Sequence, residues 1–64
     1  MKLRIKELRE SRGETQFDLS IATGIQVPVI CRVETGATKN PRIGTLLKIA
    51  RHYGVPIEEL FAEK

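Results

Sequence analysis

Apolar residues recur at helical spacing along the 64-residue chain, in short stretches separated by glycine or proline. Their spacing predicts five short helices and no sheet, at about 2–11, 16–22, 28–34, 43–53 and 56–62. Gly13, Gly36 and Gly54 each follow a predicted helix, where a residue in the left-handed conformation commonly ends it. The chain is therefore expected to be one all-α domain over residues 1–64, a compact bundle of five short helices.

The stretch from residue 16 to 35 is predicted to hold two of these helices, joined by a tight turn. One phase of apolar positions ends at Gly24, and a second phase begins at Ile25. Pro28 is expected to open the second helix, where its missing N–H leaves no hydrogen bond unmade. This is the layout of a DNA-binding helix-turn-helix, whose second helix enters the major groove.

Composition and charge agree with a globular DNA-binding protein. Hydrophobic residues make up 41% of the chain and charged residues 30%, and no apolar run approaches the roughly 20 residues that span a membrane. The single cysteine forms no internal disulfide, so we expect a cytoplasmic protein. The net charge of +3 is concentrated after residue 18. Between residues 19 and 57, one acidic residue, Glu34, is set against Arg32, Lys39, Arg42, Lys48 and Arg51.

The sequence predicts neither an enzyme nor a metal site. It contains no nucleophile paired with a base, no paired carboxylates and no phosphate-binding loop. His52 is expected on the outer face of the fourth helix without a partner at ligand spacing, so we expect no metal, cofactor or small-molecule ligand. Cys31 is expected to be a small filler one step off the DNA-reading face; the alternative is a thiol that senses oxidation.

Several motifs resemble the phage-repressor and Cro-like (Xre-type) helix-turn-helix family. They are Ile5-Lys6-Glu7-Leu8-Arg9, Thr15-Gln16, Thr23-Gly24-Ile25, Ile30-Cys31-Arg32-Val33-Glu34-Thr35-Gly36, Asn40-Pro41, Leu46-Leu47-Lys48-Ile49-Ala50, and Gly54-Val55-Pro56-Ile57-Glu58-Glu59-Leu60-Phe61. These motifs cover nearly the whole chain in the family's order and spacing. The resemblance implies a lambda-repressor-like DNA-binding domain with its helix-turn-helix at the second and third helices.

Spacing and resemblance together give the candidate DNA contacts. The base-reading candidates are Gln26, Val27, Pro28, Val29 and Arg32. The phosphate-binding candidates are Thr15, Gln16, Thr35, Lys39, Asn40 and Arg42. The resemblance also gives Gln16 a bracing role toward the recognition helix, and it implies a partly buried structural ion pair between Arg9 and Glu34.

Arg32 is the strongest base-reading candidate, because its guanidinium matches the O6 and N7 atoms of guanine. A phosphate contact or a surface ion pair is its alternative role. Val27, Pro28 and Val29 stand where the family commonly has polar residues, so they would contact thymine methyl groups. The alternative is that this apolar surface binds a protein.

Two further positions depart from the family pattern. Glu14 replaces a usual leucine, and the pair Phe17 and Ile21 replaces usual polar residues. Either Phe17 fills the volume that Glu14 vacates, or the pair is exposed and marks a contact surface.

These observations predict a sequence-specific transcriptional regulator, expected to be a repressor. It would bind double-stranded DNA at a palindromic operator as a homodimer, with half-sites roughly 34 Å apart. The dimer would form through the fourth and fifth helices or the chain ends, either in solution or only on DNA. The competing prediction is a protein-interaction module of the same fold, such as an antitoxin, that uses the surface at 27–29. The operator and the regulated gene cannot be inferred from the sequence.

Overall fold

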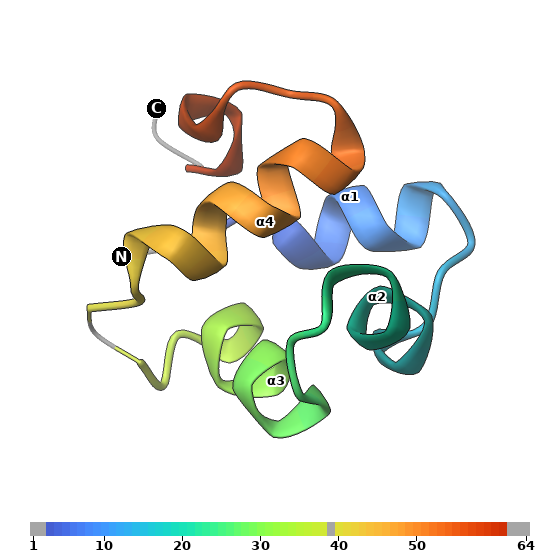
Figure 1. Ribbon diagram of the computed structural model, residues 1–64, viewed down its shortest axis with the longest axis horizontal. Coiled ribbons are helices and arrows are strands. Elements are labelled where there is room, and N and C mark those ends of the chain that lie inside the picture. The colour runs from blue at the N-terminus through green and yellow to red at the C-terminus, as the bar shows by residue number, and fades with distance from the viewer. Residues whose placement is uncertain (1–2, 39, 62–64) are drawn as a thin grey trace.

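The computed structural model describes residues 3–38 and 40–61. Its elements are the α-helices α1 (Ile5–Ser11), α2 (Gln16–Thr23), α3 (Val27–Thr35) and α4 (Ile43–Tyr53), followed by one 3₁₀ helix, η1 (Ile57–Leu60). In Figure 1, α4 crosses the middle of the molecule in front of α1, with α2 and α3 below it and η1 above it. None of the helices in these two ranges is long and apolar enough to cross a membrane.

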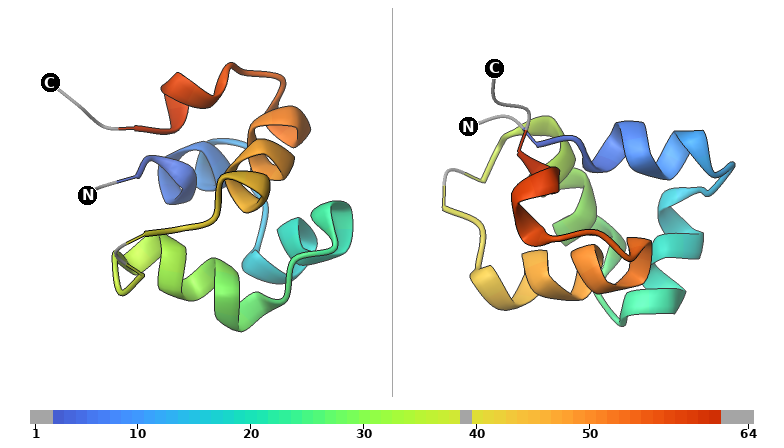
Figure 2. Two further views of the ribbon diagram at one scale, coloured as in Figure 1. Left: turned by 60° about the vertical axis from the view of Figure 1, so that its left-hand side comes forward. Right: turned by 90° about the horizontal axis from the view of Figure 1, so that it is seen from above.

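The fifth predicted helix, at about 56–62, is present as a 3₁₀ helix and is shorter than predicted. Phe61 has already left the helical conformation, with φ −93° and ψ 131°, and it forms an isolated antiparallel bridge with Leu3. The Arg4 N–H also donates to the Leu60 carbonyl at 2.7 Å. Figure 2 shows the start and the end of the described chain side by side. This pairing keeps residues 3 and 4 out of α1, which begins at Ile5 rather than near residue 2.

The other helix boundaries lie close to the predicted ones. Thr15 and Asp18 form a capping box at the start of α2, where the Thr15 hydroxyl accepts from Asp18 N–H and the Asp18 carboxylate accepts from Thr15 N–H, both at 3.0 Å. Helix α3 begins at Val27, one residue earlier than predicted, and Pro28 lies within its first turn. Gly36 ends α3 with φ +82°, a conformation that a residue with a side chain rarely adopts.

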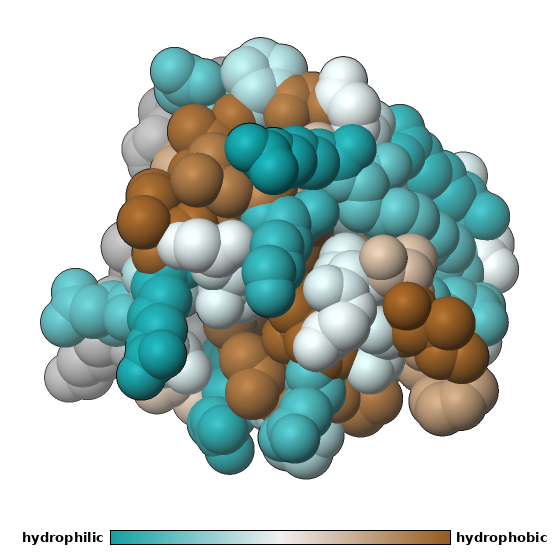
Figure 3. Space-filling model, in the orientation of Figure 1, coloured by the Kyte–Doolittle hydropathy of each residue, from teal (hydrophilic) through white to brown (hydrophobic). Residues whose placement is uncertain are grey.

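Two apolar pairs remain on the surface. Phe17 and Ile21 of α2 are 65% and 67% exposed, so the first alternative, that Phe17 fills a gap left by Glu14, is wrong, and the second, that the pair is exposed, is confirmed. The brown surface over α2 on the right of Figure 3 reflects this exposure. Ile43 and Leu47, whose helical spacing continues the apolar stripe of α4, are 63% and 40% exposed. The buried face of α4 is therefore narrower than the sequence pattern indicates.

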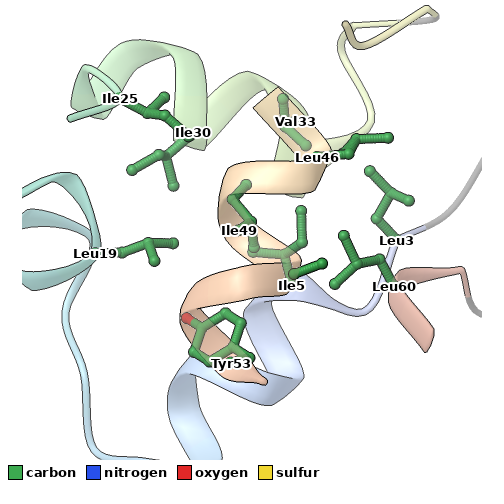
Figure 4. Packing of buried hydrophobic residues seen from close by; sticks show 11 residues of the cluster. Leu3, Ile5, Leu19, Ile25, Ile30, Val33, Leu46, Ile49, Tyr53 and Leu60 are labelled. Atoms are coloured by element: carbon green, nitrogen blue, oxygen red, sulfur yellow. The ribbon is translucent and has the colours of Figure 1, made fainter. Parts of the chain in front are cut away.

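The core draws side chains from all four α-helices and from η1. Ile5, Leu19, Ile30, Ile49 and Leu60 are its largest fully buried side chains. Figure 4 shows these residues converging around α4, whose inner face faces both α1 and the pair α2–α3. Because α3 contributes Ile30 at the centre of this core, its orientation relative to the rest of the domain is fixed.

Candidate nucleic-acid interface

Helices α2 and α3 form a helix-turn-helix whose turn is held by local hydrogen bonds. Gly24 adopts a left-handed conformation, with φ +78°, directly after α2. The Thr23 hydroxyl donates to the Leu19 carbonyl at 2.7 Å and accepts from the Ile25 N–H at 3.3 Å. Ile25 is buried beneath the turn. The angle between α2 and α3 is thus set by both backbone geometry and packing.

Helix α3 has one buried face and one exposed face. Ile30 and Val33 are buried against the core. On the other side Pro28, Cys31 and Arg32 are exposed. Nine residues make a helix about 13 Å long, and α3 lies at the lower edge of the molecule in Figure 1. This exposed edge has the size and position of a helix that enters a DNA major groove.

The base-reading candidates are not equally accessible. Gln26, Pro28 and Arg32 are exposed, whereas Val27 is half-buried. Val29 is also half-buried and packs against the core, which leaves less of its side chain for DNA. Cys31 is exposed on α3, so its predicted role as a small filler is wrong.

Three of the six phosphate candidates, Thr35, Asn40 and Arg42, lie on or beside α3. A shallow hollow between α3 and the following segment is lined by Arg32, Asn40 and Arg42. Thr35 is exposed near the end of α3, and its hydroxyl donates to the Arg32 carbonyl at 3.3 Å. Lys39 lies outside the described residues. The guanidinium groups of Arg32 and Arg42 and the amide of Asn40 thus surround one hollow beside α3. Such groups can donate hydrogen bonds to the phosphate oxygens of a DNA backbone.

Gln16 and the predicted ion pair form one network behind α3. Arg9 contacts Glu34 through two bonds, Nε to Oε2 at 2.7 Å and Nη2 to Oε1 at 3.2 Å. The Gln16 side chain donates to the same Glu34 Oε1 at 2.9 Å, so it braces the end of α3. The two charged side chains are only 10% and 3% exposed, and the hydrogen bonds to Glu34 raise the pKa of Arg9 against the effect of burial. Thr15, the remaining phosphate candidate, uses its hydroxyl as the α2 cap.

The sequence comparison identifies the family. Residues 4–62 match the model of the Cro/C1-type HTH DNA-binding domain. The chain belongs to this family. The resemblance inferred from the motifs is thereby confirmed, and the family is one of DNA-binding domains rather than enzymes.

Individual relatives agree with this membership. The chain is 40% identical over 57 residues to the HTH-type transcriptional regulator DdrOP3 of Deinococcus deserti, covering 89% of this chain and 43% of that protein. It is 33% identical over 60 residues to the cryptic phage CTXphi transcriptional repressor RstR of Vibrio cholerae, covering 94% and 53%. An HTH-type transcriptional regulator of Archaeoglobus fulgidus is 38% identical over 61 residues, covering 95% and 86%. The chain thus spans about half the length of the first two relatives.

This Cro/C1-type domain also contains a polar cluster that the sequence analysis missed. Glu14 accepts a hydrogen bond from Tyr53 Oη at 2.8 Å and lies 2.7 Å from His52 Nε2. His52 thus has a carboxylate partner 38 residues away in the chain, which a search for ligand spacing in the sequence could not reveal. The Arg12 guanidinium lies over the Tyr53 ring, 4.8 Å from its centroid. The only sequence signal was the carboxylate at a position where the family usually has leucine.

The cluster shifts the pKa values of Glu14 and Tyr53. Burial disfavours the charged form of Glu14, but hydrogen bonds from His52 and Tyr53 outweigh it and lower the pKa of Glu14 below its usual value. Burial, together with the bond to Glu14, raises the pKa of Tyr53. Glu14 is therefore a carboxylate at neutral pH, and it joins the α1–α2 connection to the end of α4.

Proposed function

We propose that this domain is a sequence-specific transcriptional regulator that inserts α3 into the major groove of its operator and represses transcription. The observation that carries the proposal is that α3 has one face buried in the core and the opposite face exposed. Ile30 and Val33 hold one side in the core, while Arg32 is exposed on the other side beside the hollow that Arg42 lines. The names of the Deinococcus and Vibrio relatives, a transcriptional regulator and a transcriptional repressor, support the same assignment.

Base reading is assigned mainly to Arg32 and Pro28. The planar fork of Arg32 bonds guanine O6 and N7, a contact worth roughly 1–3 kcal/mol against a wrong base. Pro28 lies one helical turn earlier and is exposed, so it contacts a thymine methyl group at a neighbouring step, with Val27 beside it. Gln26 reads adenine or contacts the sugar-phosphate backbone at the start of α3. Val29 contributes less, because it packs on the core.

Phosphate contacts hold α3 in register. Arg42, Asn40 and Thr35 are assigned to the strand that flanks the hollow, together with Lys39. Gln16 at the start of α2 is assigned to the other strand through its backbone N–H at the helix N-terminus, and Thr15 is assigned to it through its exposed hydroxyl, because the Thr15 N–H already donates to Asp18. The Gln16 amide acts chiefly as a brace, since it is bonded to Glu34.

Two copies are proposed to occupy one operator. A helix-turn-helix protein that binds as a symmetric pair reads inverted half-sites about one turn of DNA apart, roughly 34 Å. The proposed place of action is the cytoplasm, where a regulator of this kind meets its operator.

The test is selection of bound duplexes from random DNA with the wild type, Arg32→Ala and the matched control Arg51→Ala. Arg51 is exposed on α4, where it lines a different hollow, beside Ala22 and Thr23, and its replacement removes the same charge. We expect the wild type to select a motif with a guanine in each half-site. Arg32→Ala should lose the preference at that position alone, and Arg51→Ala should keep the motif. If no motif is selected, or if Arg32→Ala leaves it intact, α3 does not read DNA and the apolar surface at 27–29 is better assigned to a protein partner.

A further inference from the structure

One residue beside the helix-turn-helix, Glu14, is bonded to two other helices through all of its polar groups. Its N–H donates to the Arg9 carbonyl at 3.1 Å, and its carbonyl accepts from Arg9 Nη1 at 2.8 Å. Its carboxylate accepts from Tyr53 Oη at 2.8 Å and lies 2.7 Å from His52 Nε2. Arg9 belongs to α1, and His52 and Tyr53 are the last two residues of α4. Glu14 thus joins the chain just before α2 to both of these helices.

The start of α2, directly after Glu14, is not held by a buried side chain of its own. Residues 15–18 are exposed or half-buried, and Leu19 is the first buried side chain of the helix. Among the described residues, hydrogen bonds join this end to other helices at two places, the Gln16 side chain on Glu34 of α3 and the carboxylate of Glu14 on α4. The position of the start of α2 relative to α4 therefore depends on Glu14.

Helix α4 connects the two parts of the domain that are proposed to contact phosphates. Arg42 directly precedes α4, which has 11 residues and is about 16 Å long, and its other end contacts Glu14. In Figure 1 the segment before α4 lies at the left and α2 at the right, with α3 between them and below α4. The view from above in Figure 2 shows the same separation. The length of α4 is comparable with the width of a major groove, about 12 Å.

We infer that Glu14 is a positioning residue for DNA binding, an inference that rests on the proposed function. By bonding to the end of α4, Glu14 fixes the start of α2 at the separation from Arg42 that lets both contact the phosphates flanking one major groove. Removing its carboxylate breaks the hydrogen bonds to α4. The DNA contacts of α3 and Arg42 do not depend on those bonds, because Ile30 and Val33 hold α3 in the core.

The test uses the operator selected by the wild type, with one phosphate at a time replaced by an uncharged methylphosphonate. Arg42→Ala identifies the strand that Arg42 contacts, and the sensitive phosphates across the groove are the α2-side phosphates. The variant is Glu14→Ala, and the matched control is Glu58→Ala, which removes the same charge from an exposed position on η1. Far-UV circular dichroism checks that both are folded. If Glu14→Ala does not fold, Tyr53→Phe replaces it, because this change removes only the hydroxyl that donates to Glu14.

The positioning role predicts a change on one side of the groove. In the wild type, a methylphosphonate on either side should weaken binding roughly tenfold, the usual size of one charge-assisted hydrogen bond. Glu14→Ala should lose the α2-side effect and keep the effect on the Arg42 side, and Glu58→Ala should keep both. Glu14→Gln retains an oxygen that can accept from Tyr53 Oη, so it should recover part of the α2-side effect. A substitution that only destabilised the fold would weaken binding to all duplexes alike and leave both effects in place.

The outcomes separate this inference from the proposed function. If Glu14→Ala keeps the full α2-side effect, Glu14 does not position α2, and DNA binding by α3 still stands. If the wild type shows an effect on the Arg42 side alone, α2 contacts no phosphate and the inference is overturned in the same way. If the wild type shows no effect on either side, the proposed phosphate contacts fail together with the inference.

Discussion

Removing one partner of the Arg9–Glu34 pair should unfold a large fraction of the domain. The Glu34 side chain is 3% exposed, and Arg9→Ala would leave its carboxylate with only the Gln16 amide. Breaking a buried pair in this way costs about 3–5 kcal/mol. A 64-residue domain is stabilised by about 3–10 kcal/mol in total. The loss is therefore comparable with the whole stability of the fold.

The measurement is thermal and urea unfolding, followed by far-UV circular dichroism because the chain has no tryptophan. For a domain of this size, 3 kcal/mol corresponds to a fall in Tm of roughly 12 °C or more. Arg9→Ala and Glu34→Ala should each show this fall, and the double variant should cost clearly less than their sum. Glu7→Ala is the control, because Glu7 pairs with Arg4 at 3.3 Å on the surface and is 69% exposed. Its replacement should cost less than about 1 kcal/mol.

Two results would contradict this reasoning. If the losses for Arg9→Ala and Glu34→Ala are additive, the two side chains do not share one interaction in solution. If either loss is as small as that of Glu7→Ala, water screens the pair and its burial contributes little. A stability difference that disappears in high salt would indicate the same, since buried pairs are screened much less than exposed ones.

Three further predictions concern the rest of the domain. Glu14→Gln should cost about 1–2 kcal/mol at pH 7. Because the pKa of Glu14 is lowered on folding from its ordinary value of 4.5, urea unfolding at several pH values should show this difference shrinking below about pH 4.5. Arg42→Ala should weaken binding to all duplexes alike and reduce the slope of log K against log salt by about 0.9, and an unchanged slope would remove Arg42 from the interface. Replacing operator thymines opposite Pro28 with uracil should cost about 1 kcal/mol or less per methyl group, measured by titration of matched duplexes, and no loss would exclude methyl contact.

The helix pattern could be predicted from sequence because local signals determine it. Thr15 and Asp18 cap α2, and Gly24 and Gly36 end helices in the left-handed conformation. The type of the last element could not be predicted in this way. Its helix is cut short because Phe61 pairs with Leu3, a contact across almost the whole chain that no local pattern reveals.

Side-chain exposure was predicted less well than helix position. The apolar spacing of α4 includes Ile43 and Leu47, yet the core has room only for the narrower face around Ile49. Cys31 was expected to be a filler and is exposed, because the buried face of α3 is already filled by its neighbours Ile30 and Val33. Such errors arise because periodicity identifies a face without giving its width.

The partners of Glu14 show a different limit of sequence reasoning. His52 and Tyr53 are 38 and 39 residues away, and neither forms a spacing motif with Glu14. A carboxylate at an apolar position nevertheless needs hydrogen-bond donors when it is largely buried. The physical argument thus predicts that donors exist, and only the three-dimensional structure identifies them.

The polar contacts divide the domain into parts whose variants should behave differently. Arg9 bonds Glu34 at the end of α3 and also donates to the Glu14 carbonyl at 2.8 Å, so one side chain ties α3 to the segment that leads into α2. Replacing Arg9 should lower stability and operator affinity together while leaving the selected bases unchanged. Arg32 makes no side-chain contact of this kind among the described residues, so replacing it should change the selected bases at constant Tm. The two causes of lost operator affinity can therefore be distinguished by thermal unfolding. Replacing Arg9 should lower the Tm as well as the affinity, whereas replacing Arg32 should lower the affinity alone.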